Sequence, residues 1–430
     1  MINLQSIHNK NMDETLVKEK LDNGLNVYIF PKKEYVKQYA MLSVDFGSND
    51  IDFVDVKNGS KRHMPTGIAH FLEHQLFEDQ EASIFEKFAD LGASANAYTN
   101  FDSTNYLFSS SSNFNQSLTN LLDFVQNPYF NQKNVEKEKG IIIQEIKMYQ
   151  DNPYWRSYFN LLSALYSKHP VKNDIAGTEA SVNSITPEDL YICYYNFYLP
   201  SNMDLILIGD LDPEKILNLI RENQAKKDFP HFKNPVSIIQ EEPEAVAKKL
   251  VKEKMNISRP IVQMAFKDPV KSQKPAEIIK KEYIVNLLLD IVFGRSSKNY
   301  NELYDKGIID NSFSCSYNKK PDYAYVHLHG ESHKPDLMRE KIKEKLVKID
   351  QTEIEKNFER IKRKYQGSFI RLFNNFNNLA SEFINYRRLG IDIFELAEII
   401  DAISLEDLIN YSDQVFNKEL MVESIILNEE

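Results

Sequence analysis

The stretch Pro65–Glu78, PTGIAHFLEHQLFE, constrains this chain more than any other part of its sequence. It places His70, Glu73 and His74 in the pattern His-x-x-Glu-His, within an apolar segment that has the periodicity of a helix. At 3.6 residues per turn, His70 and His74 lie one turn apart on the same face, so both imidazoles can reach one ion. Glu73 lies beside that face, where its carboxylate can hold a water without binding the metal. Two imidazole nitrogens, a carboxylate and an open position for water suit zinc.

The alternative is a surface helix that carries two solvated histidines. The neighbours of the two histidines argue against it, because they are the large apolar residues Ile68, Phe71, Leu72, Leu76 and Phe77. The pattern is also the inverted form of the commoner zinc-peptidase signature, with the same side chains in the opposite chain order. The sequence therefore favours a metal site.

Length and charge limit the other possibilities. A chain of 430 residues is too long for one ordinary domain, so two units of roughly 200 residues each are expected. Its 52 basic and 63 acidic residues give a net charge of −11, which argues against nucleic acid as a partner. No stretch approaches the roughly 20 apolar residues that span a bilayer, and the N-terminus has no apolar run typical of a signal peptide. We therefore expect no membrane partner and a cytoplasmic location.

A change in composition marks the expected domain boundary. Residues 229–246 carry Pro230, Pro235 and Pro243 among charged residues, with little periodicity, which is typical of a linker. This predicts an N-terminal domain over residues 1–228, with the histidine pattern, and a C-terminal domain over residues 247–430.

The two expected domains repeat each other in sequence. ITPEDL at residues 185–190 is echoed by ISLEDL at residues 403–408, an offset of 403 − 185 = 218, and Met203 and Met421 keep this offset in the next predicted strand. An offset that stays unchanged through two elements indicates duplication. The histidine pattern is not duplicated, because residues 286–290 contain no histidine. We expect only the N-terminal half to hold a metal.

A third ligand is needed, and Glu145 is the best candidate. It lies on a helix expected over residues 134–150, with Asn134 as N-cap and Glu138 seven residues earlier on the same face. Its neighbours Ile141–Ile146 are mostly apolar, where an unpaired carboxylate is unfavourable. From spacing alone, a salt-bridged glutamate at the edge of the solvent stays an equal alternative.

Several segments, in their order and spacing, resemble the pitrilysin/insulinase family of zinc metallopeptidases. They are GIAHFLEHQLFE, LGASANAYTNFDSTNYLFSS, VEKEKGIIIQEIKMYQDNP, HPVKNDIAGTEASVNSITPEDL and FYLPSNMDLILIGDLDP, and together they cover most of residues 20–215. The chain is most similar to the small bacterial members of this family, which also includes the mitochondrial processing peptidases. The resemblance implies an α+β fold with two homologous halves, each a largely antiparallel sheet packed with helices.

The resemblance also implies the roles of the site residues. It assigns one Zn²⁺ per chain to His70, His74 and Glu145, makes Glu73 the general base, and makes Glu138 a carboxylate that orients a ligand. In such a site, Glu73 takes the proton of a water that attacks a peptide carbonyl and later delivers it to the leaving amine.

The family lays its substrate along an edge strand, which the segment Asn96-Ala97-Tyr98 resembles. Backbone hydrogen bonds to an added strand give affinity without demanding a particular sequence. The resemblance therefore implies that Asn96, Ala97 and Tyr98 bind a peptide substrate. The alternative is an ordinary edge strand that a loop protects.

One family feature is missing from the C-terminal half. Active members have an Arg and a Tyr in a segment resembling Leu-Arg-x-Lys-x-x-x-Tyr, but residues 303–310 here read LYDKGIID, with Tyr304 at the Arg position and Asp310 at the Tyr position. This predicts a heterodimer in which a homologous partner chain supplies the Arg/Tyr pair. The alternative is that Tyr300 or Tyr317 serves instead, in a homodimer or a monomer.

These observations predict a zinc endopeptidase that acts on peptides or unfolded segments, with a homologous chain completing its active site. The rival interpretations are a non-catalytic scaffold subunit of a peptidase-like heterodimer and a hydrolase of small molecules. The complete set of His70, Glu73, His74 and Glu145 argues against the scaffold.

Overall fold

The computed structural model describes residues 5–78, 84–230, 232–270, 274–347, 349–412 and 414–429. The chain forms two compact units. The first unit contains residues 1–147, 173–240 and 376–384, and the second contains residues 148–172, 241–375 and 385–430. Residues 148–172 of the N-terminal half thus belong to the second unit, and residues 376–384 of the C-terminal half belong to the first. The division of the sequence at residues 229–246 stays a prediction.

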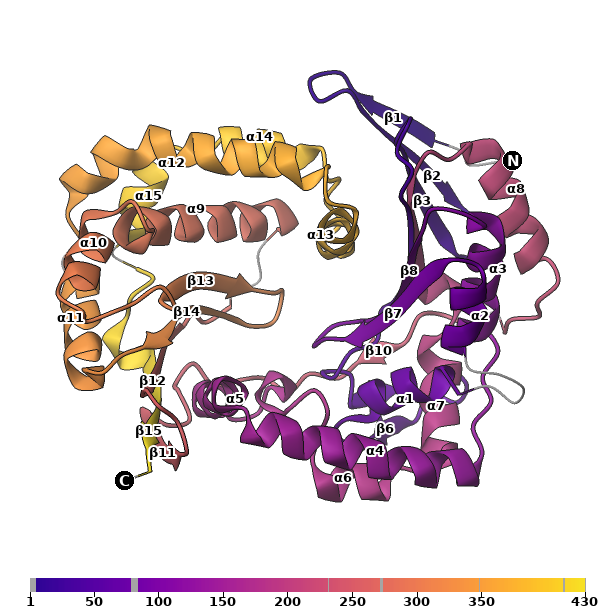
Figure 1. The fold of residues 1–430 in the computed structure, drawn as a ribbon, viewed down its shortest axis with the longest axis horizontal. Helices are drawn as coiled ribbons and strands as arrows, with labels where there is room; N and C mark the ends of the chain where they lie inside the picture. Colours follow the sequence, from indigo (N-terminus) through magenta and orange to yellow (C-terminus); the bar gives the residue numbers. More distant parts are fainter. Residues whose placement is uncertain are drawn as a thin grey trace. The chain divides into compact units, whose positions relative to one another are not determined.

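The first unit is built on a seven-stranded sheet with the order β1-β2-β3-β9-β4-β8-β7 (Figure 1). The strands are β1 (Gln5–Asn9), β2 (Glu14–Lys20), β3 (Asn26–Pro31), β4 (Gln38–Val44), β7 (Ala93–Thr99), β8 (Thr104–Ser110) and β9 (Met203–Gly209). All neighbouring strands are antiparallel except β3 and β9. A small second sheet joins β5 (Asp52–Val54), β6 (Lys61–His63) and β10 (Val236–Ser237).

Helices cover both faces of the seven-stranded sheet. Those on or around it are α1 (Ile68–Leu76), α2 (Ile84–Asp90), α3 (Phe114–Val125), α4 (Gln132–Asp151), α6 (Glu179–Ser184), α7 (Pro187–Phe197) and α8 (Pro213–Gln224). In Figure 1, α3 and α8 lie on one face of the sheet. On the other face lies the first part of α13 (Phe376–Arg388), of which residues 376–384 belong to the first unit. The ring of Phe383 packs 4.8 Å from Tyr28 and 5.3 Å from Phe30, two residues that point to the same face of β3.

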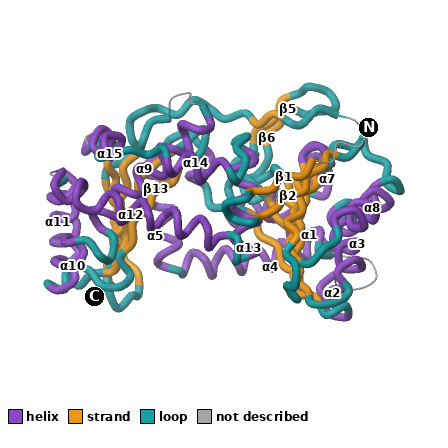
Figure 2. Tube along the Cα trace, turned by 90° about the horizontal axis from the view of Figure 1, so that it is seen from above, coloured by secondary structure: helices purple, strands orange, loops and turns teal. Residues whose placement is uncertain are grey.

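The second unit is built on a five-stranded sheet with the order β11-β15-β12-β14-β13. Its strands are β11 (Leu250–Met255), β12 (Ile261–Lys267), β13 (Ser314–Lys319), β14 (Ala324–Glu331) and β15 (Met421–Asn428), and its helices are α5 (Pro153–Leu165), α9 (Pro275–Phe293), α10 (Lys298–Asp305), α11 (Pro335–Val347), α12 (Gln351–Leu372), α14 (Glu395–Asp401) and α15 (Leu405–Ser412). Figure 2 shows the strands of each unit gathered together with helices beside them. No helix in the described part of the chain is long and apolar enough to cross a membrane.

The two units repeat one topology, which confirms the predicted pair of homologous halves. Strands β3-β9-β4-β8-β7 of the first unit correspond in order to β11-β15-β12-β14-β13 of the second. In both, the first two strands are parallel and the rest antiparallel. The offset also holds at element starts, because 405 − 187 = 218 for α15 and α7, and 421 − 203 = 218 for β15 and β9.

The start of α4 differs from the prediction. The helix begins at Gln132, two residues before the expected N-cap. The side chain of Asn131 accepts a hydrogen bond from the backbone N–H of Asn134 at 2.9 Å. Asn131 therefore satisfies one of the free amides of the first turn, and Asn134 lies within that turn.

Candidate active site

Helix α1 is held at its beginning by a close approach of two backbone segments. Gly67, the residue before the helix, has φ +88°, and a Cβ atom added to it would lie 2.4 Å from the carbonyl oxygen of Ala176. The hydroxyls of Thr66 and Ser181 lie 3.0 Å apart across the same contact. Only glycine fits this conformation and this space, so position 67 sets where α1 begins and how it lies.

The structure brings the three expected metal ligands together. The Nε2 atoms of His70 and His74 lie 3.7 and 3.5 Å from Oε2 of Glu145 on α4. One ligand atom from each residue falls within 4.8 Å of the others, and they form the single His/Cys/Asp/Glu group of this kind among the described residues. Ligands about 2.05 Å from a tetrahedral zinc lie about 3.4 Å apart, so the spacing and the donor types both fit zinc.

Glu138 lies on the same face of α4 as Glu145, and it contacts the ligand His74 instead of belonging to the ligand set. Its Oε1 is 2.9 Å from Nδ1 of His74, and its side chain is buried. Burial lowers the pKa of His74, but the hydrogen bond to Glu138 and the charges of the neighbouring carboxylates outweigh it, so the pKa is raised. A hydrogen bond at Nδ1 directs Nε2 toward the metal position, the arrangement by which carboxylates orient metal-binding histidines.

His70 is kept neutral by its surroundings. The side chain is buried, and burial together with the nearby His74 lowers its pKa to about 3. A neutral imidazole can donate a lone pair to a metal, whereas an imidazolium cannot. The Nδ1 atom of His70 is buried without a hydrogen-bond partner among the described residues, so Nε2 is the nitrogen directed at Glu145.

Glu73 lies beside the three ligands without being one of them. It is buried, and Oε2 accepts a 2.6 Å hydrogen bond from the Thr99 hydroxyl. Burial raises the pKa of Glu73, an effect that the hydrogen bonds from Thr99 and the charge of His74 only partly offset. A carboxylate with a raised pKa accepts a proton more readily, which suits a general base.

The segment expected to bind substrate lies on β7, which is the last strand of its sheet and pairs only with β8 among the described strands. The side chains of Asn96 and Tyr98 point to one face, as the alternation of a strand requires. The Tyr98 hydroxyl lies 3.2 Å from that of Ser381 on α13, and the side-chain Oδ1 of Asn96 accepts from the backbone N–H of Ala97 at 2.9 Å. The edge is present, and its role in substrate binding stays a prediction.

Residues 303–310, where the family's Arg and Tyr are missing, belong to the second unit. Tyr304 on α10 is 43% exposed and stacks on Tyr300. Asp310 lies 2.6 Å from the guanidinium of Arg259, and its carboxylate also accepts from the backbone N–H of Ser312 at 2.8 Å. Neither position carries the side chain that the family places there.

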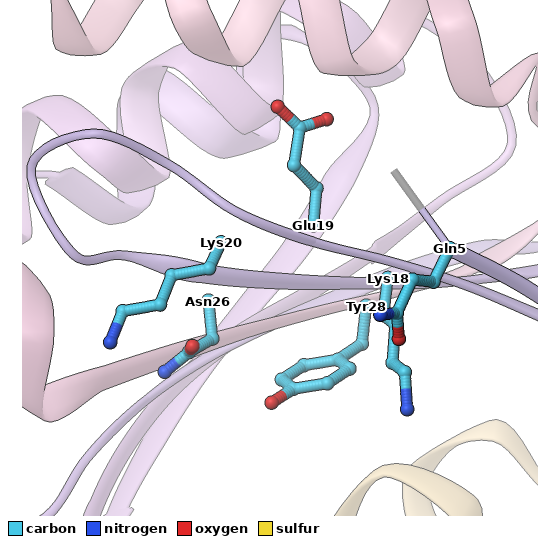
Figure 3. Close-up of a pocket in the computed structure, with 6 residues that line it drawn as sticks. All are labelled: Gln5, Lys18, Glu19, Lys20, Asn26 and Tyr28. Carbon is cyan, nitrogen blue, oxygen red and sulfur yellow. The ribbon is translucent and has the colours of Figure 1, made fainter. Parts of the chain in front are cut away.

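A cavity of about 150 Å³ lies elsewhere in the first unit, on strands β1–β3 (Figure 3). It is lined by Gln5, Lys18, Glu19, Lys20, Asn26 and Tyr28. In Figure 3, Glu19 points away from the other five, and it is bound to Arg221 at 2.6 Å. These strands are at the opposite end of the sheet order from β7, so the cavity is separate from the histidine cluster.

Thr99 and Ser381 are the contacts that the sequence did not indicate. Thr99 is 26 residues from Glu73, and Ser381 is 283 residues from Tyr98. Neither belongs to a pattern of residues with a chemical meaning. The packing of α1 against β7 brings Thr99 to Glu73, and residues 376–384 of α13, which belong to the first unit, bring Ser381 to Tyr98.

Two family models and a bacterial relative match this chain in sequence. Residues 53–179 match the family model described as "Insulinase (Peptidase family M16)", and residues 184–365 match the one described as "Peptidase M16 inactive domain". The "Uncharacterized zinc protease YmfH" of Bacillus subtilis (strain 168) is 43% identical over 95% of this chain and 95% of its own length.

Solved structures share the fold. A putative M16-like peptidase from Alicyclobacillus acidocaldarius is similar over 100% of this chain and 99% of its own, with a TM-score of 0.90 and 34% identity. The periplasmic protease PqqL from Escherichia coli has a similar fold, with a TM-score of 0.72 and 18% identity, over 96% of this chain but only 48% of its own.

Proposed function

Because the chain belongs to the insulinase family of peptidases (family M16), we propose that it is a zinc-dependent endopeptidase that cleaves peptides or unfolded segments. The observation that carries the proposal is the convergence of His70, His74 and Glu145, with Glu73 beside them. A relative named as a zinc protease supports it at the level of the family.

The site residues of the first unit have different roles in hydrolysis. His70, His74 and Glu145 would hold one Zn²⁺, and Glu138 orients His74. When bound, zinc supplies Lewis acidity toward a water and a peptide carbonyl. Glu73 accepts the proton of the attacking water and passes it to the leaving amine.

The edge of β7 offers a place for the substrate. An extended peptide that adds to this edge forms backbone hydrogen bonds, which bind many sequences with little discrimination. The N–H of Ala97 is covered by the Asn96 side chain and would exchange that bond for one to the peptide. In a folded protein most extended segments are already paired within their own sheets, so peptides and unfolded segments are the better substrates for this edge.

We further propose that a homologous chain completes the active site. The replacements at Tyr304 and Asp310 remove the Arg/Tyr donors that the family uses, and the loss of one donor to a developing oxyanion typically lowers the rate by about 100- to 1,000-fold. A cytoplasmic location stays a prediction.

A mixing experiment tests the proposal. The chain is purified, loaded with zinc and assayed on a quenched peptide library, first alone and then with the family homologue from the same genome. We expect strong cleavage only in the mixture, and none with Glu73→Gln. Full activity of the isolated chain would refute the need for a homologous partner chain. No activity under any condition would favour the alternative that the chain is a non-catalytic scaffold subunit.

A further inference from the structure

The carboxylate of Glu73 is held by two donors from one residue of β7. The Thr99 hydroxyl is 2.6 Å from Oε2 of Glu73, and the Thr99 backbone N–H also hydrogen-bonds this carboxylate. An O–H···O⁻ bond of this length is in the range of charge-assisted hydrogen bonds, which are about twice as strong as neutral ones. Glu73 is therefore fixed from outside its own helix.

The direction of the hydroxyl bond follows from its neighbour. Oγ1 of Thr104 lies 3.4 Å from Oγ1 of Thr99 and donates its own proton to the carbonyl oxygen of Phe46 at 2.8 Å. Thr104 thus has no second proton to offer. The Thr99 hydroxyl proton is free to point at Glu73, whose ionised carboxylate can only accept.

The two hydrogen bonds from Thr99 to Glu73, which we call the Thr99 clamp, lie at a definite place on β7. The N–H of Asn100 bonds to Ser103, next to the turn between β7 and β8, and backbone groups on a strand alternate in direction. Accordingly, the N–H of Ala97 donates to Asn96 and not to β8, and the N–H of Thr99 donates to Glu73. The free edge of β7 therefore ends at the general base.

We propose that Thr99 is the positioning residue for Glu73, tying the general base to the strand that binds the substrate. The inference rests on the proposed function. The Thr99 hydroxyl holds Oε2 of Glu73 while the carboxylate accepts the proton of the attacking water. The hydroxyl contributes the orientation of the base, not the binding of zinc or of the peptide.

Isosteric substitution tests this role. Thr99→Val removes the hydroxyl and keeps the shape and the N–H, so kcat should fall about 10- to 100-fold while KM and zinc content stay within twofold. Thr99→Ser restores the hydroxyl and should recover most of the wild-type kcat. Thr15→Val makes the same change on β2 of the same sheet, where Thr15 contacts His8, and should leave kcat unchanged. Glu73→Gln combined with Thr99→Val should be no less active than Glu73→Gln alone.

A second measurement does not depend on activity. In zinc-free protein, the ¹³C resonance of the Glu73 carboxyl carbon, assigned with Glu73→Gln, should shift in Thr99→Val and not in Thr15→Val. An unchanged resonance, an unchanged kcat, or a Thr99→Ser variant as impaired as Thr99→Val would overturn the role of Thr99. A wild-type mixture that cleaves no peptide would instead refute the proposed function, while the resonance still reports on the clamp.

Discussion

The two nitrogens of His74 have different partners, because Nδ1 lies 2.9 Å from Glu138 while Nε2 lies 3.5 Å from Glu145. Both glutamates project from α4, seven residues apart, so one helix supplies a ligand and the group that orients another ligand. The ring is thereby fixed in the tautomer that leaves the Nε2 lone pair for a metal.

Substitution of the orienting carboxylate should weaken metal binding without removing a ligand. Glu138→Gln keeps the size of the side chain but loses the charge that makes the imidazole of His74 a stronger donor. We expect zinc affinity, measured by competition with a chelator, to fall about 10-fold. Glu136→Gln on the same helix, where the side chain pairs with Lys139, is the matched control and should bind zinc as the wild type does.

Removal of a ligand should have a larger effect. His74→Ala leaves two protein ligands, which hold zinc poorly, so the purified variant should contain almost no metal. His63→Ala replaces a histidine that is 75% exposed at its side chain and paired with Asp52, and should keep one zinc per chain. Zinc bound stoichiometrically to His74→Ala would show that the ligand set is wrong.

Substitutions at Gly59 and Gly67 distinguish the cost of a positive φ alone from the added cost of a steric clash. Both have positive φ, but a Cβ at position 59 meets nothing within 4 Å, whereas one at position 67 meets the backbone of Ala176 at 2.4 Å. Gly59→Ala should destabilise by about 1 kcal/mol. Gly67→Ala should lose about 1–3 kcal/mol more and weaken zinc binding by shifting α1. Equal losses in urea unfolding would contradict the close contact.

Acid should weaken the second unit through His327. Its ring is buried and bonds to Gln263 at 2.9 Å, and burial together with His329 lowers its pKa to about 3. Below pH ~6.5 the unfolded chain takes up a proton that the folded chain refuses until pH ~3, so stability falls as the pH falls through this window.

From pH 7 to pH 5 this loss should be about 2 kcal/mol. His327→Gln cannot titrate, so its unfolding free energy in urea should fall by that much less over the same interval. The same pH dependence in both proteins would show that His327 is not neutral in the folded state.

Much of the fold was predictable because its signals are local. The apolar strand β9 and the helix with the histidine pattern are continuous stretches, and the repeated ITPEDL and ISLEDL segments place α7 and α15 at one offset. The hairpin of β1 and β2 was missed because these strands are polar and charged, and only their pairing with β3 at the sheet edge makes them strands.

The candidate site was predictable as far as its residues lie on two helices. His70 and His74 follow from helical spacing, whereas spacing alone leaves Glu145 equally compatible with a metal ligand and with a salt-bridged glutamate. The Thr99 clamp and the contact of Tyr98 with Ser381 could not be predicted, because tertiary packing alone brings these residues together. No helical or strand period links positions so far apart in the chain.

The most direct test compares zinc content and peptide cleavage in the wild type and in Glu73→Gln, each mixed with the homologous chain. Glutamine cannot accept the water proton, and the three ligands are untouched. We predict one zinc per chain in both proteins, with cleavage only by the wild type. Loss of zinc from Glu73→Gln, or equal cleavage by both proteins, would contradict the assignment of Glu73 as the general base of a zinc peptidase.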